Sequence, residues 1–180
     1  MVLLFLLLIL FGFVFPIVIT LYHIFCLVSE FKGAPYVPTS GKIVKEILNK
    51  ANLKKGQNFI ELGSGDGRVV RAAVKNFKVK GLGVDIHVPL IWYSKIISRL
   101  QKVPNIEFRI QDFFKTDLSK VDVLFLFLLP NTLKKLREKI LKECPKNTLI
   151  ISHGFQIEGM EKYLESKIHR TLFPTYFYRI

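Results

Sequence analysis

The chain has 180 residues, a formal net charge of +13 and two cysteines. This length predicts one domain with a sizeable core. Cys26 and Cys144 lack CxxC or histidine spacing, which argues against a disulfide framework and against a zinc or other metal site. The positive charge suits anionic lipid, nucleic acid or an acidic protein. Because no arginine-rich run is interleaved with aromatic residues, we expect no nucleic-acid partner.

The first segment is an almost unbroken apolar run from Val2 to Val28, longer than the ~20 residues that a spanning helix needs. It predicts a single-pass transmembrane anchor over residues 1–29. A signal peptide is disfavoured because the run has no basic start and no evident small-residue cleavage site. Lys32, Lys42 and Lys45 follow the run, so the positive-inside tendency places the rest of the chain in the cytoplasm, or in the matrix of an organelle.

We predict a hinge at residues 30–40, because Gly33, Pro35 and Pro38 interrupt any helix there. Thr39 or Ser40 is suited to cap the helix that follows. From residue 41 the apolar positions recur with a helical period. We therefore expect the folded domain to cover residues 41–180.

The stretch from Asn58 to Arg68 predicts a buried strand, a glycine-rich turn and the start of a helix. In parallel sheets such a turn forms a nucleotide-type pocket beyond the strand ends. The pattern is not the dinucleotide Gly-x-Gly-x-x-Gly, because Arg68 occupies the third glycine position, and no Gly-Lys-Ser/Thr of a phosphate loop follows. A tight turn without any ligand is the alternative. The residues of interest here are Glu61, Gly63, Ser64, Gly65 and Gly67.

Residues at the ends of two further predicted strands are expected to complete this pocket. The strand from Val79 to Ile86 carries Asp85, 18 residues after Gly67, close to the ~20 expected for a carboxylate that binds ribose hydroxyls. The strand from Asn105 to Ile110 is followed by Asp112 and Phe113, which we expect beside a nucleotide base.

Between those two strands, the helix from Pro89 to Leu100 carries Trp92 and Tyr93. Aromatic rings in such a helix belong more often to the core than to a cofactor site. We therefore expect both side chains to be packed inside the domain.

The continuous apolar run from Val121 to Leu129 predicts a central strand that is buried on both faces. Active-site groups are expected where it ends, at Pro130 and Asn131. A helix from Thr132 to Glu143, a strand from Thr148 to Ser152 and a closing hairpin of residues 168–170 with 175–180 follow. The fold class is therefore α/β: a Rossmann-like, doubly wound, mostly parallel seven-strand sheet with a C-terminal antiparallel hairpin, preceded by one transmembrane helix.

Four segments carry a resemblance to a known family. Glu61, two residues before the first glycine, resembles the acid of motif I in class I S-adenosylmethionine (SAM) methyltransferases. Together with three other segments it is similar to the small seven-strand protein-lysine methyltransferases. That family includes archaeal enzymes and mitochondrial enzymes acting on the ATP synthase c-subunit and the adenine nucleotide translocase. The segments are Pro-Tyr-Val-Pro-Thr at 35–39, Glu-Leu-Gly-Ser-Gly-Asp-Gly-Arg at 61–68, Phe-Leu-Leu-Pro-Asn at 127–131 and Ile-Ser-His-Gly-Phe at 151–155.

The resemblance implies SAM as cofactor and a protein lysine side chain as substrate. Pro130, Asn131 and Tyr36 would position the lysine amine, and His153 is either a proton acceptor or a structural residue. The residues implied in cofactor binding are Glu61, Gly63, Ser64, Gly65, Gly67, Asp85, Asp112, Phe113 and Thr39.

Two alternatives stay open from the sequence. The anchor would also suit a methyltransferase for a small molecule, lipid or quinone. The chain lacks the Asn/Asp-Pro-Pro-aromatic sequence of many amine methyltransferases, which leaves room for a non-catalytic SAM-binding membrane module.

Overall fold

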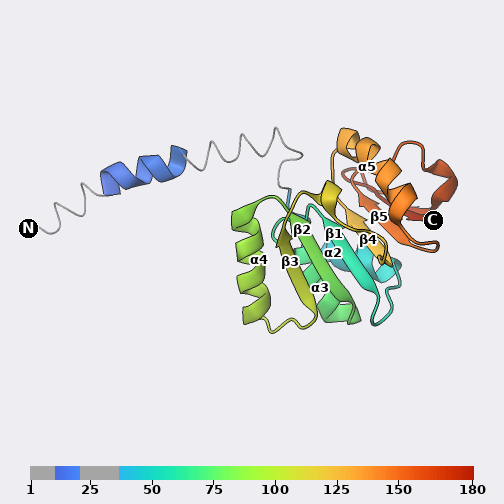
Figure 1. The fold of residues 1–180 in the computed structure, drawn as a ribbon, viewed down its shortest axis with the longest axis horizontal. Helices are drawn as coiled ribbons and strands as arrows, with labels where there is room; N and C mark the ends of the chain where they lie inside the picture. The colour runs from blue at the N-terminus through green and yellow to red at the C-terminus, as the bar shows by residue number, and fades with distance from the viewer. Residues whose placement is uncertain (1–10, 21–36) are drawn as a thin grey trace, which may run out of the picture. The chain divides into compact units, whose positions relative to one another are not determined.

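The computed structural model describes residues 11–20 and 37–180 (Figure 1). The chain divides into two compact units, Met1–Pro35 and Tyr36–Ile180. Residues 11–20 of the first unit are helical. Within the two described ranges, no helix is both long and apolar enough to cross a membrane. Most of the predicted anchor, and the predicted site residue Tyr36, lie outside the described residues.

The second unit is built on a seven-stranded sheet with the order β3-β2-β1-β4-β5-β7-β6. Strands β1 to β5 are parallel, while β7 runs antiparallel to both β5 and β6. The predicted α/β class with a C-terminal antiparallel pair is confirmed. The strands are β1 (Asn58–Leu62), β2 (Lys80–Asp85), β3 (Ile106–Ile110), β4 (Val123–Leu126), β5 (Leu149–His153), β6 (Leu164–Ile168) and β7 (Thr175–Arg179).

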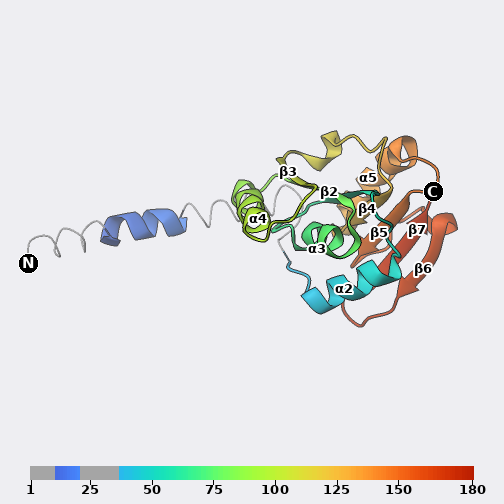
Figure 2. The same ribbon diagram turned by 90° about the horizontal axis from the view of Figure 1, so that it is seen from below.

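Helices cover both faces of the sheet (Figure 2). α2 (Gly41–Lys50), α3 (Arg68–Phe77) and α4 (Val88–Leu100) pack on one face, and α5 (Pro130–Glu143) packs on the other. β1 shows why two cores form, because alternate strand residues point to opposite faces. Phe59 joins the core under α2 and α3, whereas Ile60 and Leu62 join the core under α5. Two short 3-10 turns, η1 (Phe113–Lys115) and η2 (Glu161–Tyr163), complete the unit.

The end of β4 differs from the sequence expectation. The strand was expected to run to Leu129, but it ends at Leu126, and α5 begins at Pro130 rather than at Thr132. Proline favours the first turn of a helix, where its missing N–H needs no partner and its fixed φ fits. Pro130 and Asn131 therefore lie in the first turn of α5. The hairpin also differs, because its first strand is Leu164–Ile168 instead of residues 168–170.

The expectation that Trp92 and Tyr93 are core residues is wrong. Their side chains are 61% and 49% exposed, while Ser94 and Ser98 of the same helix are buried. α4 packs close to the glycine-rich turn, where Ser94 Oγ donates hydrogen bonds to the carbonyl oxygens of Gly65 (3.2 Å) and Leu90 (2.9 Å). A short polar side chain fits that gap, so the bulky side chains turn outward.

Candidate active site

The glycine-rich turn between β1 and α3 is held by β2. The carbonyl oxygen of Val84 accepts hydrogen bonds from the N–H groups of Gly63 (2.8 Å) and Ser64 (3.0 Å). The backbone at all three turn glycines has positive φ: 75° at Gly63, 52° at Gly65 and 70° at Gly67. Residues that carry a side chain rarely adopt this backbone conformation, whereas glycine adopts it without a steric penalty. The three glycines are therefore required by the backbone conformation of the turn.

Close packing surrounds the turn on two sides. A Cβ atom on Gly63 would lie 2.9 Å from Leu128 Cδ2, so the segment after β4 reaches the turn directly. A Cβ atom on Gly67 would meet the ring of Phe108 in β3 and would lie 2.9 Å from Ser94 Oγ. The turn thus lies at the carboxyl end of β1, between β2 and β4, where a ligand of a parallel sheet binds.

Glu61 is buried at the end of β1, with 5% of its surface exposed. Its Oε2 accepts a hydrogen bond from Val70 N in the first turns of α3, at 3.0 Å. Burial raises the pKa of Glu61 well above its usual value, against the lowering effect of the Val70 bond. The negative charges of Asp66 and Asp85 raise this pKa further. A cationic ligand group beside Glu61 would therefore favour its ionised form.

Asp85 links three elements at the end of β2. Its Oδ2 accepts a hydrogen bond from Gly65 N (2.8 Å) and its Oδ1 accepts one from His87 N (2.9 Å). Its carbonyl oxygen accepts from Gln111 N (3.0 Å), which brings the end of β3 alongside. Both carboxylate oxygens have further lone pairs, so the ribose contact implied by the sequence is compatible with this position and stays a prediction.

Asp112 and Phe113 lie directly after β3. Asp112 is exposed, and its Oδ1 accepts from Phe114 N at 3.0 Å, which caps η1. Phe113 is buried, and its ring centroid lies 4.9 Å from that of Phe114. The structure brings this pair to the same sheet edge as Asp85, and their predicted contact with a nucleotide base is untested.

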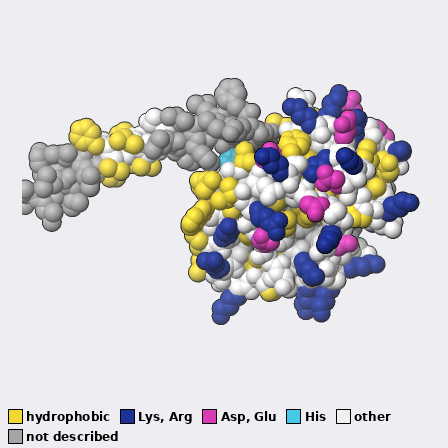
Figure 3. Space-filling model, in the orientation of Figure 1, with side chains coloured by type: hydrophobic (Ala, Val, Ile, Leu, Met, Phe, Trp, Pro, Cys, Tyr) yellow, Lys and Arg dark blue, Asp and Glu magenta, His cyan; other side chains and the backbone are white. Residues whose placement is uncertain are grey.

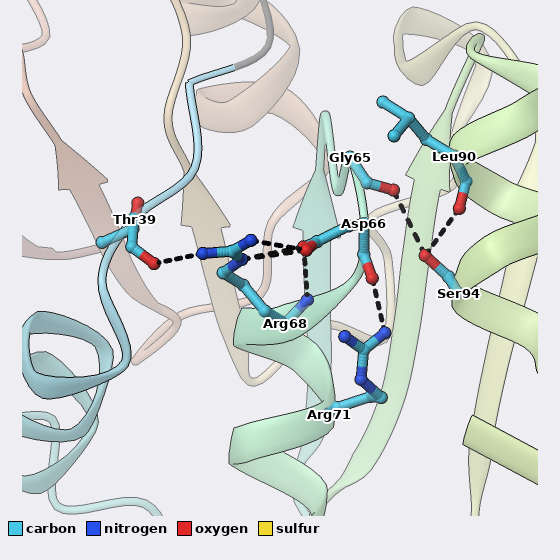
Figure 4. A network of polar contacts seen from close by, with 7 residues as sticks. All are labelled: Thr39, Gly65, Asp66, Arg68, Arg71, Leu90 and Ser94. Atoms are coloured by element: carbon cyan, nitrogen blue, oxygen red, sulfur yellow. Dashed lines mark hydrogen bonds and ion pairs between the residues drawn. The ribbon is translucent and has the colours of Figure 1, made fainter. Parts of the chain in front are cut away.

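Sequence reasoning missed a polar network around Asp66 (Figure 4). The Arg68 guanidinium forms an ion pair with Asp66 Oδ2 (2.7 Å), and its Nη1 donates to the carbonyl oxygen of Thr39 (3.0 Å). Arg68 thereby ties the buried Thr39, just before α2, to the turn. The available signal was Arg68 itself, which takes the third glycine position of a dinucleotide motif.

A second arginine, Arg71 of α3, also binds the glycine-rich turn. Arg71 is buried, and its Nη1 donates a hydrogen bond to the carbonyl oxygen of Asp66. Burial lowers the pKa of Arg71, and the charges of Asp66 and Glu61 act in the opposite direction. The two arginines place positive charge beside the buried acids of the site.

The predicted substrate side lies where β4 leads into α5. Pro130 and Asn131 are exposed, and they follow Leu128, whose Cδ2 would lie 2.9 Å from a Cβ atom on Gly63. The carbonyl oxygen of Leu129 accepts from Thr132 N and Leu133 N, both at 3.0 Å, so it serves the helix.

His153, at the end of β5, is 1% exposed, and its Nδ1 lies 2.9 Å from Thr175 Oγ1. Burial, with a smaller effect from Arg170, lowers its pKa to about 4. The ring is therefore neutral at physiological pH. Its burial and its bond to Thr175 favour the structural role over that of a proton acceptor.

Comparison with known proteins identifies the family of this chain. The family profile described as the ANTKMT methyltransferase domain matches residues 61–163, more than half of the chain and all of the turn, Asp85 and the β4 end. The chain belongs to this methyltransferase family.

Two relatives show how far the likeness extends. This methyltransferase is 34% identical over 129 residues to a protein-lysine N-methyltransferase of Saccharolobus islandicus, covering 69% of the chain and 79% of that protein. It is 27% identical over 122 residues to the human lysine N-methyltransferase of the ATP synthase c-subunit, covering 67% of the chain. The chain spans about half, 52%, of that human protein.

Among solved structures, an RNA methyltransferase from Salinibacter ruber in complex with S-adenosylhomocysteine matches with a TM-score of 0.75 and 28% identity. The match covers 80% of this methyltransferase and 94% of that chain.

SAM is the cofactor of this methyltransferase, and the residues of the turn fit it. Glu61 is a buried acid suited to an ammonium group, and the glycines present backbone without side chains. Within the described part of the chain, Ser64 Oγ is buried without a hydrogen-bond partner, so it has capacity for a ligand atom. SAM supplies a methyl group already activated by its sulfonium.

Proposed function

We propose that this protein transfers methyl groups from SAM to lysine side chains of proteins. The observation that carries the proposal is the closeness of the segment after β4 to the glycine-rich turn: a Cβ on Gly63 would lie 2.9 Å from Leu128 Cδ2, two residues before the exposed Pro130 and Asn131. The relatives named as protein-lysine methyltransferases support the same substrate class.

The chain's own residues have one main task in this reaction, which is to hold a neutral amine in line with the methyl group. A free lysine has a pKa of ~10.4, so its proton must be lost before attack. The positive end of the dipole of α5, which begins at Pro130, disfavours an ammonium. Because the Leu129 carbonyl is used by the helix, we assign amine orientation to the Asn131 side chain, with Pro130 shaping the entrance and Tyr36 assisting.

Incubation of the purified chain with labelled SAM and a membrane extract tests the substrate class. We expect label in protein, at lysine by mass spectrometry. Label only in RNA, lipid or a quinone would overturn the proposal. Binding of SAM without turnover on any extract would instead support the non-catalytic module.

The role of Asn131 has a matched control on the same helix. Asn131→Ala should lower kcat at least tenfold while the Kd for SAM stays unchanged, since Asn131 is assigned to the amine and not to the cofactor. Glu138→Ala, at an exposed position further along α5, should leave both quantities unchanged. Equal activity of the two variants would remove Asn131 from the mechanism.

We also propose that residues 1–29 anchor the protein in a membrane as a single pass, with residues 41–180 on the cytoplasmic or matrix side. Support comes from the uncharged apolar run and the lysines that follow it. Extraction at alkaline pH should leave the protein in the membrane pellet, and added protease should reach residues 41–180 only from the predicted side. Release into the supernatant would contradict the anchor.

A further inference from the structure

Helix α4 exposes more large apolar side chains than it buries. Its buried face contains Ile91, Ser94 and Ser98, whereas its outer face carries large apolar side chains. Within the described part of the chain, Ser98 Oγ is buried without a hydrogen-bond partner. Ile91 is the one large apolar residue that α4 buries fully, whereas Val88, Trp92, Tyr93, Ile96 and Leu100 are left exposed in the described part of the chain. The outer face of α4 therefore needs a partner.

The outer apolar residues form one continuous stripe. Val88, Trp92, Ile96 and Leu100 are spaced four residues apart, which places them along one face of a helix. All four are exposed, and Leu100 is exposed by 73%. We call these four residues the α4 stripe. Figure 3 shows hydrophobic side chains gathered along the edge of the second unit that α4 forms in Figure 1.

The charges beside the stripe indicate what covers it. Lys95, Arg99 and Lys102 are exposed on or just after the helix, and residues 88–100 contain no Asp or Glu. Helices that lie on membrane surfaces combine an apolar face containing tryptophan with lysine and arginine at its border. Tryptophan and tyrosine also favour the interface between water and lipid, and Tyr93 lies next to Trp92.

We propose that the α4 stripe lies on the surface of an anionic lipid bilayer, with its side chains between the headgroups. This contact belongs to residues 36–180 and is separate from the N-terminal anchor. It has a consequence for the site, because α4 begins three residues after Asp85 and Ser94 contacts the Gly65 carbonyl. A docked α4 would hold the glycine-rich turn close to the surface of the bilayer. Lysine side chains of membrane proteins are exposed to water at this surface.

The sequence provides an internal probe for this contact, since Trp92 is the sole tryptophan of the chain. The full-length protein is reconstituted into vesicles of phosphatidylcholine with phosphatidylglycerol, with and without lipids brominated on the acyl chain. We expect the Trp92 emission to shift to the blue and to be quenched by the brominated lipid. The apolar N-terminal run has no tryptophan, so its insertion does not contribute to the signal.

Variants separate the stripe from apolar residues in general. Ile96→Asp with Leu100→Asp should abolish the quenching, whereas Leu172→Asp should leave it unchanged although Leu172 is 74% exposed. Lys95→Glu alone should shift the docking equilibrium by roughly fivefold or more, because each basic residue near an anionic surface contributes about 1 kcal/mol. Vesicles of phosphatidylcholine alone should give weaker quenching.

Two results would overturn the proposal. In the first, Trp92 of the full-length protein in vesicles is as accessible to aqueous iodide as Trp92 of the Ile96→Asp, Leu100→Asp variant, so α4 faces water. In the second, the emission shifts to the blue but brominated lipid does not quench it. The stripe is then covered by protein, either a second copy or another segment of this chain.

Discussion

The buried carboxyl of Glu61 is costly to ionise in the ligand-free protein, and it is suited to bind a cationic group of the cofactor. Its burial disfavours the ionised carboxylate, and a cationic ligand group would reverse that preference. We predict that Glu61→Gln weakens SAM binding by roughly 10- to 100-fold, since hydrogen bonds to charged groups contribute about 1.5 to 3 kcal/mol. Isothermal titration calorimetry measures this change.

The same substitution should not lower the melting temperature of the ligand-free protein. Glutamine retains an oxygen for Val70 N and removes a carboxyl that is costly to ionise when buried. A variant that melts earlier and binds SAM normally would contradict the assignment of Glu61 to the cofactor.

SAM binding should also release protons through Glu61. Its raised pKa means that the stability it contributes is present below the usual pKa and is lost as the pH rises through the folded-state value. Near that value SAM should displace up to one proton, and its affinity should fall as the pH is lowered. Calorimetry in buffers of different ionisation enthalpy counts the protons, and Glu61→Gln should release fewer.

His153 predicts a separate pH effect on folding. Its pKa is lowered to about 4, so the unfolded chain takes up a proton between about pH 6.5 and 4 while the folded protein does not. Stability should therefore fall by about 3 kcal/mol as the pH drops through this window. Urea unfolding at several pH values measures the loss. His153→Asn should flatten the profile.

At the scale of single elements, one glycine of the β1–α3 turn and one glycine before β1 separate backbone strain from packing. Gly67 and Gly56 both have positive φ, at 70° and 85°. A Cβ on Gly67 would clash with Phe108 and Ser94, but a Cβ on Gly56 would meet nothing within 4 Å. Gly56→Ala should cost about 1 to 2 kcal/mol from strain, and Gly67→Ala should cost about 1 to 3 kcal/mol more. Equal losses in urea unfolding would refute the packing argument.

Strand and helix order was predictable from the sequence, because apolar runs, turn glycines and prolines are local signals. The residues at which helices and strands end, and the side of a helix that is buried, were less predictable. Leu129 is as apolar as the strand before it, yet Pro130 starts α5 and Leu129 becomes its cap. Trp92 was assigned to the core because hydrophobicity does not reveal that Ser94 fits the gap beside Gly65.

The same limit applies to the candidate site. The motif around Glu61 predicted the glycine-rich turn, which lies after β1 at the carboxyl ends of the parallel strands, as expected. The partners of each side chain depend on residues distant in sequence. Asp85 is held by Gly65 N, 20 residues earlier, and Arg68 reaches Thr39, 29 residues earlier. No local pattern encodes those bonds.

On the scale of the whole molecule, both hydrophobic cores lie within residues 36–180. A chain that begins at Tyr36 should therefore fold cooperatively and bind SAM with a Kd within about twofold of the full-length value. Thermal unfolding and calorimetry test this. An aggregated product, or loss of SAM binding, would show that residues 1–35 take part in the fold of the second unit.

The position of β7 in the sheet constrains how the protein is made. β7 follows β6 along the chain but lies between β5 and β6. During translation β6 leaves the ribosome before its pairing partner exists, and the edge of β5 stays open until β7 arrives. An open strand edge invites pairing with other chains. Completion of the sheet therefore waits for β7, and a pause in translation before Thr175 would prolong the period in which the polypeptide is prone to aggregate.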